Sequence, residues 1–195
     1  MDPGPAAEKA RLRERFLAAR SAMTADERNA AGRAIRDAVL SLQEAGMAGT
    51  VAAYYSVGTE PDTHGLVYAL WKRGSYVLLP VWHPGSELDW ASYEGPDSLV
   101  PGRRGLIEPA APGRGPGAVA RASLVIVPAL AVDRTGVRLG RGAGCYDRAL
   151  ARVAAAVPTI ALLYDAELTG TLPAEPHDRR VSMAARPATG ITRLT

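Results

Sequence analysis

A glycine-rich, basic segment follows an apolar run in the second half of the chain. Residues 127–150 read VPALAVDRTGVRLGRGAGCYDRAL, in which Arg138 and Arg141 are surrounded by Gly136, Gly140, Gly142 and Gly144. Glycines let a backbone approach a ligand closely, and a helix that begins near Cys145 presents free N–H groups and a partial positive charge. The segment therefore predicts an anion-binding loop, most simply for a polyphosphate.

This segment differs from the common phosphate-binding motifs. It lacks the G-K-[ST] ending of a Walker loop, and it does not match a G-x-G-x-x-G motif followed by an acidic residue about twenty positions later. A surface turn with solvated arginines is the alternative. Asp147, in the first turn of the expected helix, favours binding, because Mg²⁺ is often held by one or two carboxylates together with substrate phosphates. Its alternative role is to complement the positive helix N-terminus.

Elements that could position this loop alternate along the chain. Two helices are expected first, at residues 6–22 and 25–45, with a capping box formed by Thr24 and Glu27 and a stop at Gly46. Further helices are expected at 62–74, with Asp62 or Thr63 as N-cap, and at 145–157. Strands are expected at 50–55, 75–82, 88–93, 122–132 and 159–164. Residues 94–122 are expected to form a loop, and the tail turns with one or two short strands.

The strand–helix–strand order is typical of right-handed parallel crossovers. We therefore predict one domain over residues 1–195 with an α/β fold: a three-layer α/β/α, Rossmann-like domain with a mostly parallel sheet and two N-terminal helices. Ligands in such folds bind at the carboxyl ends of the strands. Three segments that follow strands are thus candidate site segments, namely 56–63, 129–144 and 164–178.

Composition narrows the class of protein. The formal net charge of +3 is carried mostly by arginine, since Lys9 and Lys72 are the only lysines, and so small a charge is a weak argument for nucleic acid. The single cysteine, Cys145, excludes an internal disulfide, and no apolar stretch approaches the roughly 20 residues of a membrane span. The chain does not open like a secretory signal. We expect a cytoplasmic protein that binds neither nucleic acid nor a membrane.

The stretch VPALAVDRTGVRLGRGAGCYDR resembles the signature of the 5-formyltetrahydrofolate cyclo-ligase family, also called 5,10-methenyltetrahydrofolate synthetases. That signature is a strand ending in V-P-x-x-x-x-D, followed by G-x-R-L-G-x-G-x-G-x-Y-D. Other blocks match in the family order: a Lys-x-x-x-Arg pair at Lys9 and Arg13, then YYSVGTEPDT, GLIEP and LPAEPHD. The resemblance covers nearly the whole chain.

The resemblance implies a ligase that converts 5-formyltetrahydrofolate and ATP to 5,10-methenyltetrahydrofolate, ADP and phosphate, with Mg²⁺ as cofactor. The formamide oxygen is a poor leaving group. Its phosphorylation would let the N10 amine attack the formyl carbon before phosphate departs, so that catalysis would depend mainly on positioning and charge stabilisation. We expect a monomer that acts on these two small molecules.

The same resemblance implies roles for individual residues. Catalysis would involve Arg138, Arg141 and Tyr146, and magnesium would be held by Asp147 and Asp178. The folate would be bound by Tyr55, Glu60, Glu108 and Tyr146, with Glu60 accepting two N–H bonds from the pterin ring. ATP would be bound by Lys9, Arg13, Arg138, Leu139, Gly140, Arg141, Gly142, Ala143, Gly144, Cys145 and Tyr146.

Several of these roles have structural alternatives. Lys9 and Arg13 stand one turn apart and could form a solvated helix face. Glu60 could be an ordinary turn residue, and Asp178 a surface partner of His177. The three histidines, His64, His83 and His177, show no metal-ligand spacing.

The chain departs from the family pattern at three positions. Cys145 stands where a tyrosine is usual, Val132 where an aromatic residue is common, and Ala143 where glycine or lysine is usual; the first two leave the fit of the folate open. A cysteine at a helix N-terminus beside arginines is a candidate nucleophile, so a Cys145-dependent hydrolase or amidotransferase is one alternative function. A non-catalytic nucleotide- or folate-binding paralogue is the other.

Overall fold

A seven-stranded sheet forms the centre of the computed structural model, which describes residues 4–46, 49–85 and 87–195. The strand order is β12-β11-β9-β6-β1-β2-β3. The strands from β11 to β2 run parallel, and β12 and β3 are antiparallel edges. The prediction of a mostly parallel sheet is confirmed. Its strands are β1 (Thr50–Ala52), β2 (Tyr76–Val81), β3 (Asp89–Ser92), β6 (Leu124–Pro128), β9 (Thr159–Leu162), β11 (Met183–Arg186) and β12 (Gly190–Arg193).

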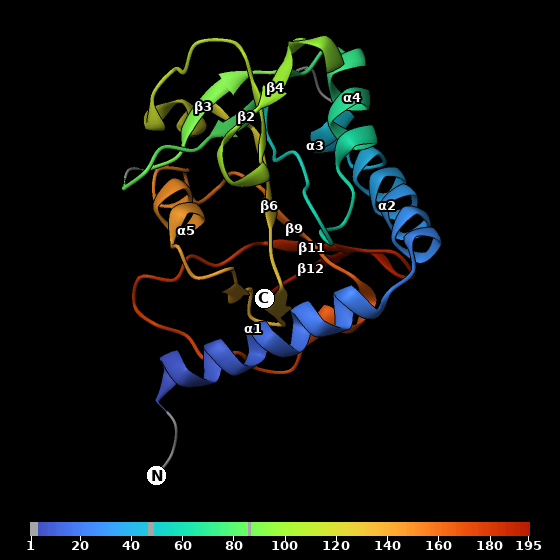
Figure 1. Cartoon of the computed structure of the whole chain (residues 1–195), viewed down its shortest axis with the longest axis vertical. Coiled ribbons are helices and arrows are strands. Elements are labelled where there is room, and N and C mark those ends of the chain that lie inside the picture. Colours follow the sequence, from blue (N-terminus) through green and yellow to red (C-terminus); the bar gives the residue numbers. More distant parts are fainter. Residues whose placement is uncertain (1–3, 47–48, 86) are drawn as a thin grey trace.

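Helices cover both faces of this sheet (Figure 1). One face carries α2 (Ala25–Leu40), α3 (Gln43–Gly46) and α4 (His64–Lys72), and there Ile35 shares a buried cluster with Ile126 of β6. The other face carries α5 (Cys145–Leu150) and the 3₁₀ turn η3 (Pro116–Arg121), and there Leu150 packs with Val127. Strands covered on both faces need apolar side chains on both, which explains the continuous apolar run in β6. The predicted three-layer α/β/α fold is confirmed.

Helix α1 (Pro5–Ala22) packs against a second, smaller sheet. This three-stranded sheet has the order β10-β7-β8, and Phe16 of α1 is buried with Leu130 and Leu139 against it. In Figure 1, α1 lies across one end of the domain. Both predicted N-terminal helices are present, and α2 begins with the predicted capping box of Thr24 and Glu27. The small sheet consists of β7 (Ala131–Asp133), β8 (Arg138–Leu139) and β10 (Leu168–Thr169).

The single strand predicted at 122–132 was wrong, because the chain changes sheets within it. After β6 ends at Pro128, Leu130 donates its backbone N–H to the carbonyl of Leu139, and β7 pairs with β8 and β10. The carbonyl of Ala129 accepts a hydrogen bond from the Arg20 side chain instead of a strand neighbour. An apolar run alone cannot reveal this change of partner.

Two predicted helices are shorter than expected. The helix predicted at 25–45 ends at Leu40, and a separate short helix, α3, ends at Gly46. The helix predicted at 145–157 ends at Leu150, since Arg152 and Val153 donate to carbonyls only three residues back. Hydrogen bonds between residues three apart form the narrower 3₁₀ turn, which commonly ends an α-helix.

The strand predicted at 50–55 ends at Ala52. Ala53 still donates its N–H to the Leu78 carbonyl of β2, but the residues after it bond to a side chain. The Thr63 hydroxyl donates to the Tyr54 carbonyl at 2.7 Å and accepts from the Ser56 N–H at 2.9 Å. Thr63 stands at the N-cap of α4 but makes no capping bond; Asp62 instead accepts from the His64 N–H at 3.3 Å.

The loop predicted at 94–122 contains short regular elements. A hairpin of β4 (Leu99–Pro101) and β5 (Ile107–Pro109) lies between the 3₁₀ turns η1 (Pro96–Ser98) and η3, with a third, η2 (Arg103–Gly105), at its tip. The loop prediction was therefore wrong for this hairpin, whose strands are too short to give a periodic pattern.

Candidate active site

A cavity of about 500 Å³ opens at the carboxyl ends of β6, β1 and β2. It is lined by Pro128 and Ala129 after β6, Tyr54 and Tyr55 after β1, and Trp82 after β2. The structure brings all the predicted site residues to this one cavity: Lys9, Arg13, Tyr55, Glu60, Glu108, Arg138, Leu139, Gly140, Arg141, Gly142, Ala143, Gly144, Cys145, Tyr146, Asp147 and Asp178. Their individual roles stay predictions.

The glycine-rich loop connects β8 to α5 and is attached to the first helix. Arg13 of α1 donates from Nε to the Gly140 carbonyl at 2.9 Å, and its guanidinium covers Gly142. Gly142 and Gly144 have φ angles of 102° and 65°, left-handed conformations that favour glycine. Two glycines thus let the loop turn sharply under Arg13 and into α5.

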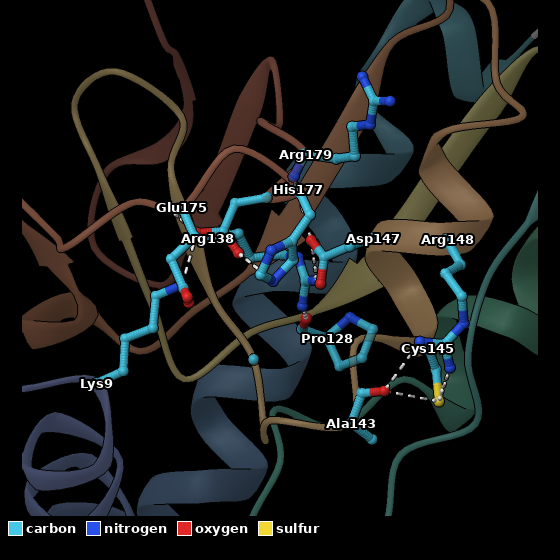
Figure 2. A network of polar contacts seen from close by, with 12 residues as sticks. Lys9, Pro128, Arg138, Ala143, Cys145, Asp147, Arg148, Glu175, His177 and Arg179 are labelled. Carbon is cyan, nitrogen blue, oxygen red and sulfur yellow. Dashed lines mark hydrogen bonds and ion pairs between the residues drawn. The ribbon is translucent and has the colours of Figure 1, made fainter. Parts of the chain in front are cut away.

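Arg138 is buried and bonded to the aspartate that follows the loop (Figure 2). Its Nη2 lies 3.0 Å from both carboxylate oxygens of Asp147, and its Nη1 donates to the Pro128 carbonyl at 3.1 Å. The backbone N–H of Arg179 also donates to Asp147, at 3.2 Å. Arg138 therefore joins the end of β6 to α5, and its positive charge is partnered within the protein.

Lys9 reaches from α1 to the segment before Asp178 (Figure 2). Its Nζ lies 2.6 Å from Asp178 and 2.7 Å from Glu175, and the residue is only 5% exposed. Burial lowers the Lys9 pKa, but the hydrogen bonds to both carboxylates outweigh it and raise that pKa above its ordinary value. Burial likewise raises the Asp178 pKa, and the bonds from Lys9 and the Glu175 N–H lower it overall. The alternative of a solvated face is wrong for Lys9.

Glu60 faces the loop from the other side of the cavity. Arg141 lies 3.3 Å from Glu60, and the Glu60 carboxylate also accepts from the Val57 N–H at 3.0 Å. Arg141 is half-exposed while Glu60 is nearly covered, and the Val57 N–H still binds Glu60 when the arginine moves away. Burial raises the pKa of Tyr146, and the neighbouring Glu60 charge raises it further. Tyr146 is thus a neutral hydroxyl group beside Glu60.

The remaining predicted folate residues belong to the wall of the cavity. The Tyr55 ring stacks on His64 with centroids 3.9 Å apart and planes 9° apart. Glu108 is buried and accepts the Trp82 N–H at 2.8 Å, so its carboxylate fastens β5 to the end of β2.

The predicted magnesium ligands have suitable chemistry, since Mg²⁺ prefers carboxylate oxygens. Asp178 binds Lys9 and the Glu175 N–H through Oδ2, and its Oδ1 lies 3.7 Å from His177 Nε2. Glu175, His177 and Asp178 offer ligand atoms within 4.8 Å of one another. The residues therefore fit a divalent cation beside Asp178. Both oxygens of Asp147 are bonded to Arg138, and its role as a metal ligand stays a prediction.

Some residues of this cavity were missed from the sequence. Glu175 was part of the LPAEPHD block, and its spacing of three from Asp178 could have identified it. Arg20, buried and bonded to Glu167, gave no signal within a charged helix. Trp82 and Arg104 also line the cavity, and no motif pointed to them.

The fold and the cavity define an α/β protein suited to binding an anionic small molecule at the carboxyl edge of its sheet. Residues 5–187 match the model of the 5-formyltetrahydrofolate cyclo-ligase family. The chain is 39% identical over 191 residues to a 5-formyltetrahydrofolate cyclo-ligase of Mycolicibacterium smegmatis, covering 95% of this chain and 97% of that one. It is 35% identical over 133 residues to the Escherichia coli protein of the same name, covering 67% and 73%.

Solved structures agree with these matches. The 5,10-methenyltetrahydrofolate synthetase of Aquifex aeolicus is similar with a TM-score of 0.81 at 27% identity, covering 95% of this chain and 92% of that one. The synthetase of Mycoplasma pneumoniae shares the fold with a TM-score of 0.72 at 20% identity, covering 91% and 97%. The chain therefore belongs to the 5-formyltetrahydrofolate cyclo-ligase family and is an enzyme of the cyclo-ligase type. This confirms the resemblance found in the sequence.

Proposed function

We propose that this enzyme uses ATP and Mg²⁺ to cyclise 5-formyltetrahydrofolate to 5,10-methenyltetrahydrofolate. The observation that carries the proposal is the cavity itself. A basic glycine loop, the buried Lys9 and two carboxylates, Asp147 and Asp178, line the same 500 Å³ space as Tyr55 and Glu60. Cations suit ATP phosphates, and a carboxylate suits the N–H edge of a pterin.

The chemistry consists of two bond exchanges. The formyl oxygen attacks the γ-phosphorus, so that an O–P bond forms while the bond from phosphorus to ADP breaks. N10 then attacks the formyl carbon and loses its proton, and the C–O bond breaks as phosphate leaves with the former formyl oxygen. The half-exposed Arg141 can leave Glu60 to contact the transferring group, and the neutral Tyr146 can donate a hydrogen bond to it.

Magnesium would be held by Asp178 and Asp147. A bound Mg²⁺ would neutralise phosphate charge. Lys9 holds Glu175 and Asp178 together, and Arg138 fixes Asp147 against the end of β6. The Lys9 and Arg138 side chains therefore position the carboxylates of Asp178 and Asp147, and this role does not require contact with a phosphate.

The other expectations from the sequence stay predictions: a cytoplasmic monomer whose partners are two small molecules and neither nucleic acid nor a membrane. None of the helices in the described ranges has the length and apolar character needed to cross a bilayer. The alternative of a non-catalytic paralogue also stays open to test.

Cys145 offers little support for a thiol-dependent reaction. Among the described residues its sulfur contacts the Ala143 carbonyl at 3.8 Å and Arg148 at 3.6 Å, and no histidine nitrogen is among its hydrogen-bond partners (Figure 2). A hydrolase or amidotransferase that depends on Cys145 would need a histidine beside the thiol. We expect Cys145→Ser to retain ATP-dependent cyclisation; loss of all activity in a folded variant would instead favour the hydrolase or amidotransferase.

The test is to follow methenyltetrahydrofolate absorbance after mixing purified protein, 5-formyltetrahydrofolate, ATP and Mg²⁺, with each small molecule omitted in turn. The two lysines of the chain supply matched variants: Lys9→Met removes the buried ammonium, and Lys72→Met removes an exposed one. Product formation should require 5-formyltetrahydrofolate, ATP and Mg²⁺. Lys9→Met should form no product, whereas Lys72→Met should form it as the wild type does. ATP binding without any product would establish the non-catalytic paralogue.

A further inference from the structure

The two ends of the active-site cavity differ in chemistry. Its β6 end contains the glycine loop with Lys9, Arg13 and Arg138. Because β1 lies between β6 and β2 in the sheet, the β2 end is the far end along the carboxyl edge. There the cavity is lined by Pro80, Trp82, Leu88, Leu106 and Ile107, by the cation Arg104, and by Glu108, whose carboxylate is occupied by the Trp82 backbone N–H. A ligand that spans the cavity thus ends beside an arginine, in mostly apolar surroundings where the Glu108 carboxylate is bonded to the backbone.

Arg104 is held in place by the hairpin at whose tip it stands. Its φ of 58° makes it the one non-glycine residue with positive φ in the described part of the chain. The turn is closed on either side, by the Gly102 N–H to the Leu106 carbonyl at 2.8 Å and by the Leu106 N–H to the Arg103 carbonyl at 3.1 Å. An arginine in this conformation is unusual and is kept by the surrounding bonds.

The Arg104 guanidinium lies over the Trp82 indole, 4.5 Å from the ring centroid. The hairpin is fastened to the same segment, since the buried Glu108 carboxylate accepts a hydrogen bond from the backbone N–H of Trp82. Within the described ranges, no carboxylate forms an ion pair with Arg104. A guanidinium that lies over an aromatic ring and has no ion-pair partner can still bind a carboxylate through two of its N–H groups.

We propose that Arg104 binds the carboxylate tail of the folate substrate. This rests on the proposed function: tetrahydrofolates consist of a pterin, an aminobenzoyl group and a glutamate whose carboxylates form the end opposite the pterin. With the reacting formyl group near the phosphate loop, the aminobenzoyl group lies among the apolar residues of the β2 end, and the glutamate reaches Arg104. Arg104 is then a specificity-determining residue that contacts substrate but no reacting atom.

The test compares Arg104→Gln with Arg103→Gln, its exposed neighbour that does not line the cavity. For 5-formyltetrahydrofolate, Arg104→Gln should raise KM about tenfold or more, the usual effect of a charged hydrogen bond, while kcat and the KM for ATP change less than about twofold. Arg103→Gln should match the wild type. Thermal unfolding of both variants checks the fold.

A second substrate separates tail recognition from a general change in the cavity. 5-Formyltetrahydropteroate lacks the glutamate, so the wild type should bind it about as weakly as Arg104→Gln binds 5-formyltetrahydrofolate. With 5-formyltetrahydropteroate, the wild type and Arg104→Gln should have the same KM. An equal loss with both substrates, or equal behaviour of the two variants, would overturn the proposal. If the wild type formed no product, the proposed function would fail, and equilibrium binding of both folates would still test Arg104.

Discussion

The buried ion pair between Arg20 and Glu167 should control the stability of the domain. Arg20 Nε lies 2.6 Å from Glu167 Oε1, and Nη2 lies 2.9 Å from Oε2, with side chains only 2% and 4% exposed. Arg20 belongs to α1 and Glu167 to the 3₁₀ turn η4 (Asp165–Glu167). The pair therefore fastens the helix that carries Lys9 and Arg13 to the rest of the cavity.

Glu167→Gln keeps the shape of the side chain and removes its charge. It leaves the Arg20 guanidinium buried without a counter-charge, which costs about 3–5 kcal/mol when a buried pair is broken. In a domain of this size each kcal/mol lowers the unfolding midpoint by roughly 2–4 °C, so we expect a decrease of roughly 6–20 °C. Solvent screening reduces this little, because neither side chain is accessible.

Thermal and urea unfolding measure this effect, and Glu87→Gln is the control. Glu87 pairs with Arg152 at the surface, where the Glu87 side chain is 34% exposed and the Arg152 side chain 42% exposed. Its loss should cost no more than about 1 kcal/mol. The double variant Arg20→Met/Glu167→Met should lose less stability than the two single variants added together. A Glu167→Gln protein as stable as the control, or strict additivity in the double variant, would refute the reasoning.

Two further predictions concern the loop and its support. Asp147→Asn should lower turnover at saturating ATP and Mg²⁺ by about tenfold or more, with a smaller change in the ATP dissociation constant, because the metal role needs the charge; an unchanged rate would contradict that role. Gly136→Ala should lower the free energy of unfolding, measured in urea, by about 1–3 kcal/mol. The φ angle of Gly136 is 83°, and a Cβ there would meet the Val181 carbonyl oxygen at 2.3 Å. Gly117→Ala, with nothing within 4 Å, is its control, and equal stability of the two variants would disprove the strain.

Local sequence signals predicted the layers of the fold and much of the cavity. The apolar runs of β6 and β9 are buried on both faces, so their pattern reported directly on the main sheet. The capping box at Thr24 worked because both of its bonds join residues three apart. The glycine loop was found in the same way, since its glycines and arginines lie within a few positions of one another.

Long-range partners could not be read from local patterns. The change of sheet after Pro128 depends on pairing of Leu130 with Leu139, and the carbonyl freed at Ala129 is satisfied by Arg20, 109 positions away. Lys9 is buried by carboxylates more than 160 positions away, at separations of 166 and 169. A charged helix reads as a solvated face unless such partners are known.

The most direct test of the proposed reaction is the stoichiometry of a single assay. ADP, phosphate and methenyltetrahydrofolate are quantified together at several times after mixing enzyme with 5-formyltetrahydrofolate, ATP and Mg²⁺. The proposal predicts equal amounts of all three products at every time, and none when either substrate is left out. Methenyltetrahydrofolate without ADP, or ADP formed without folate, would contradict it.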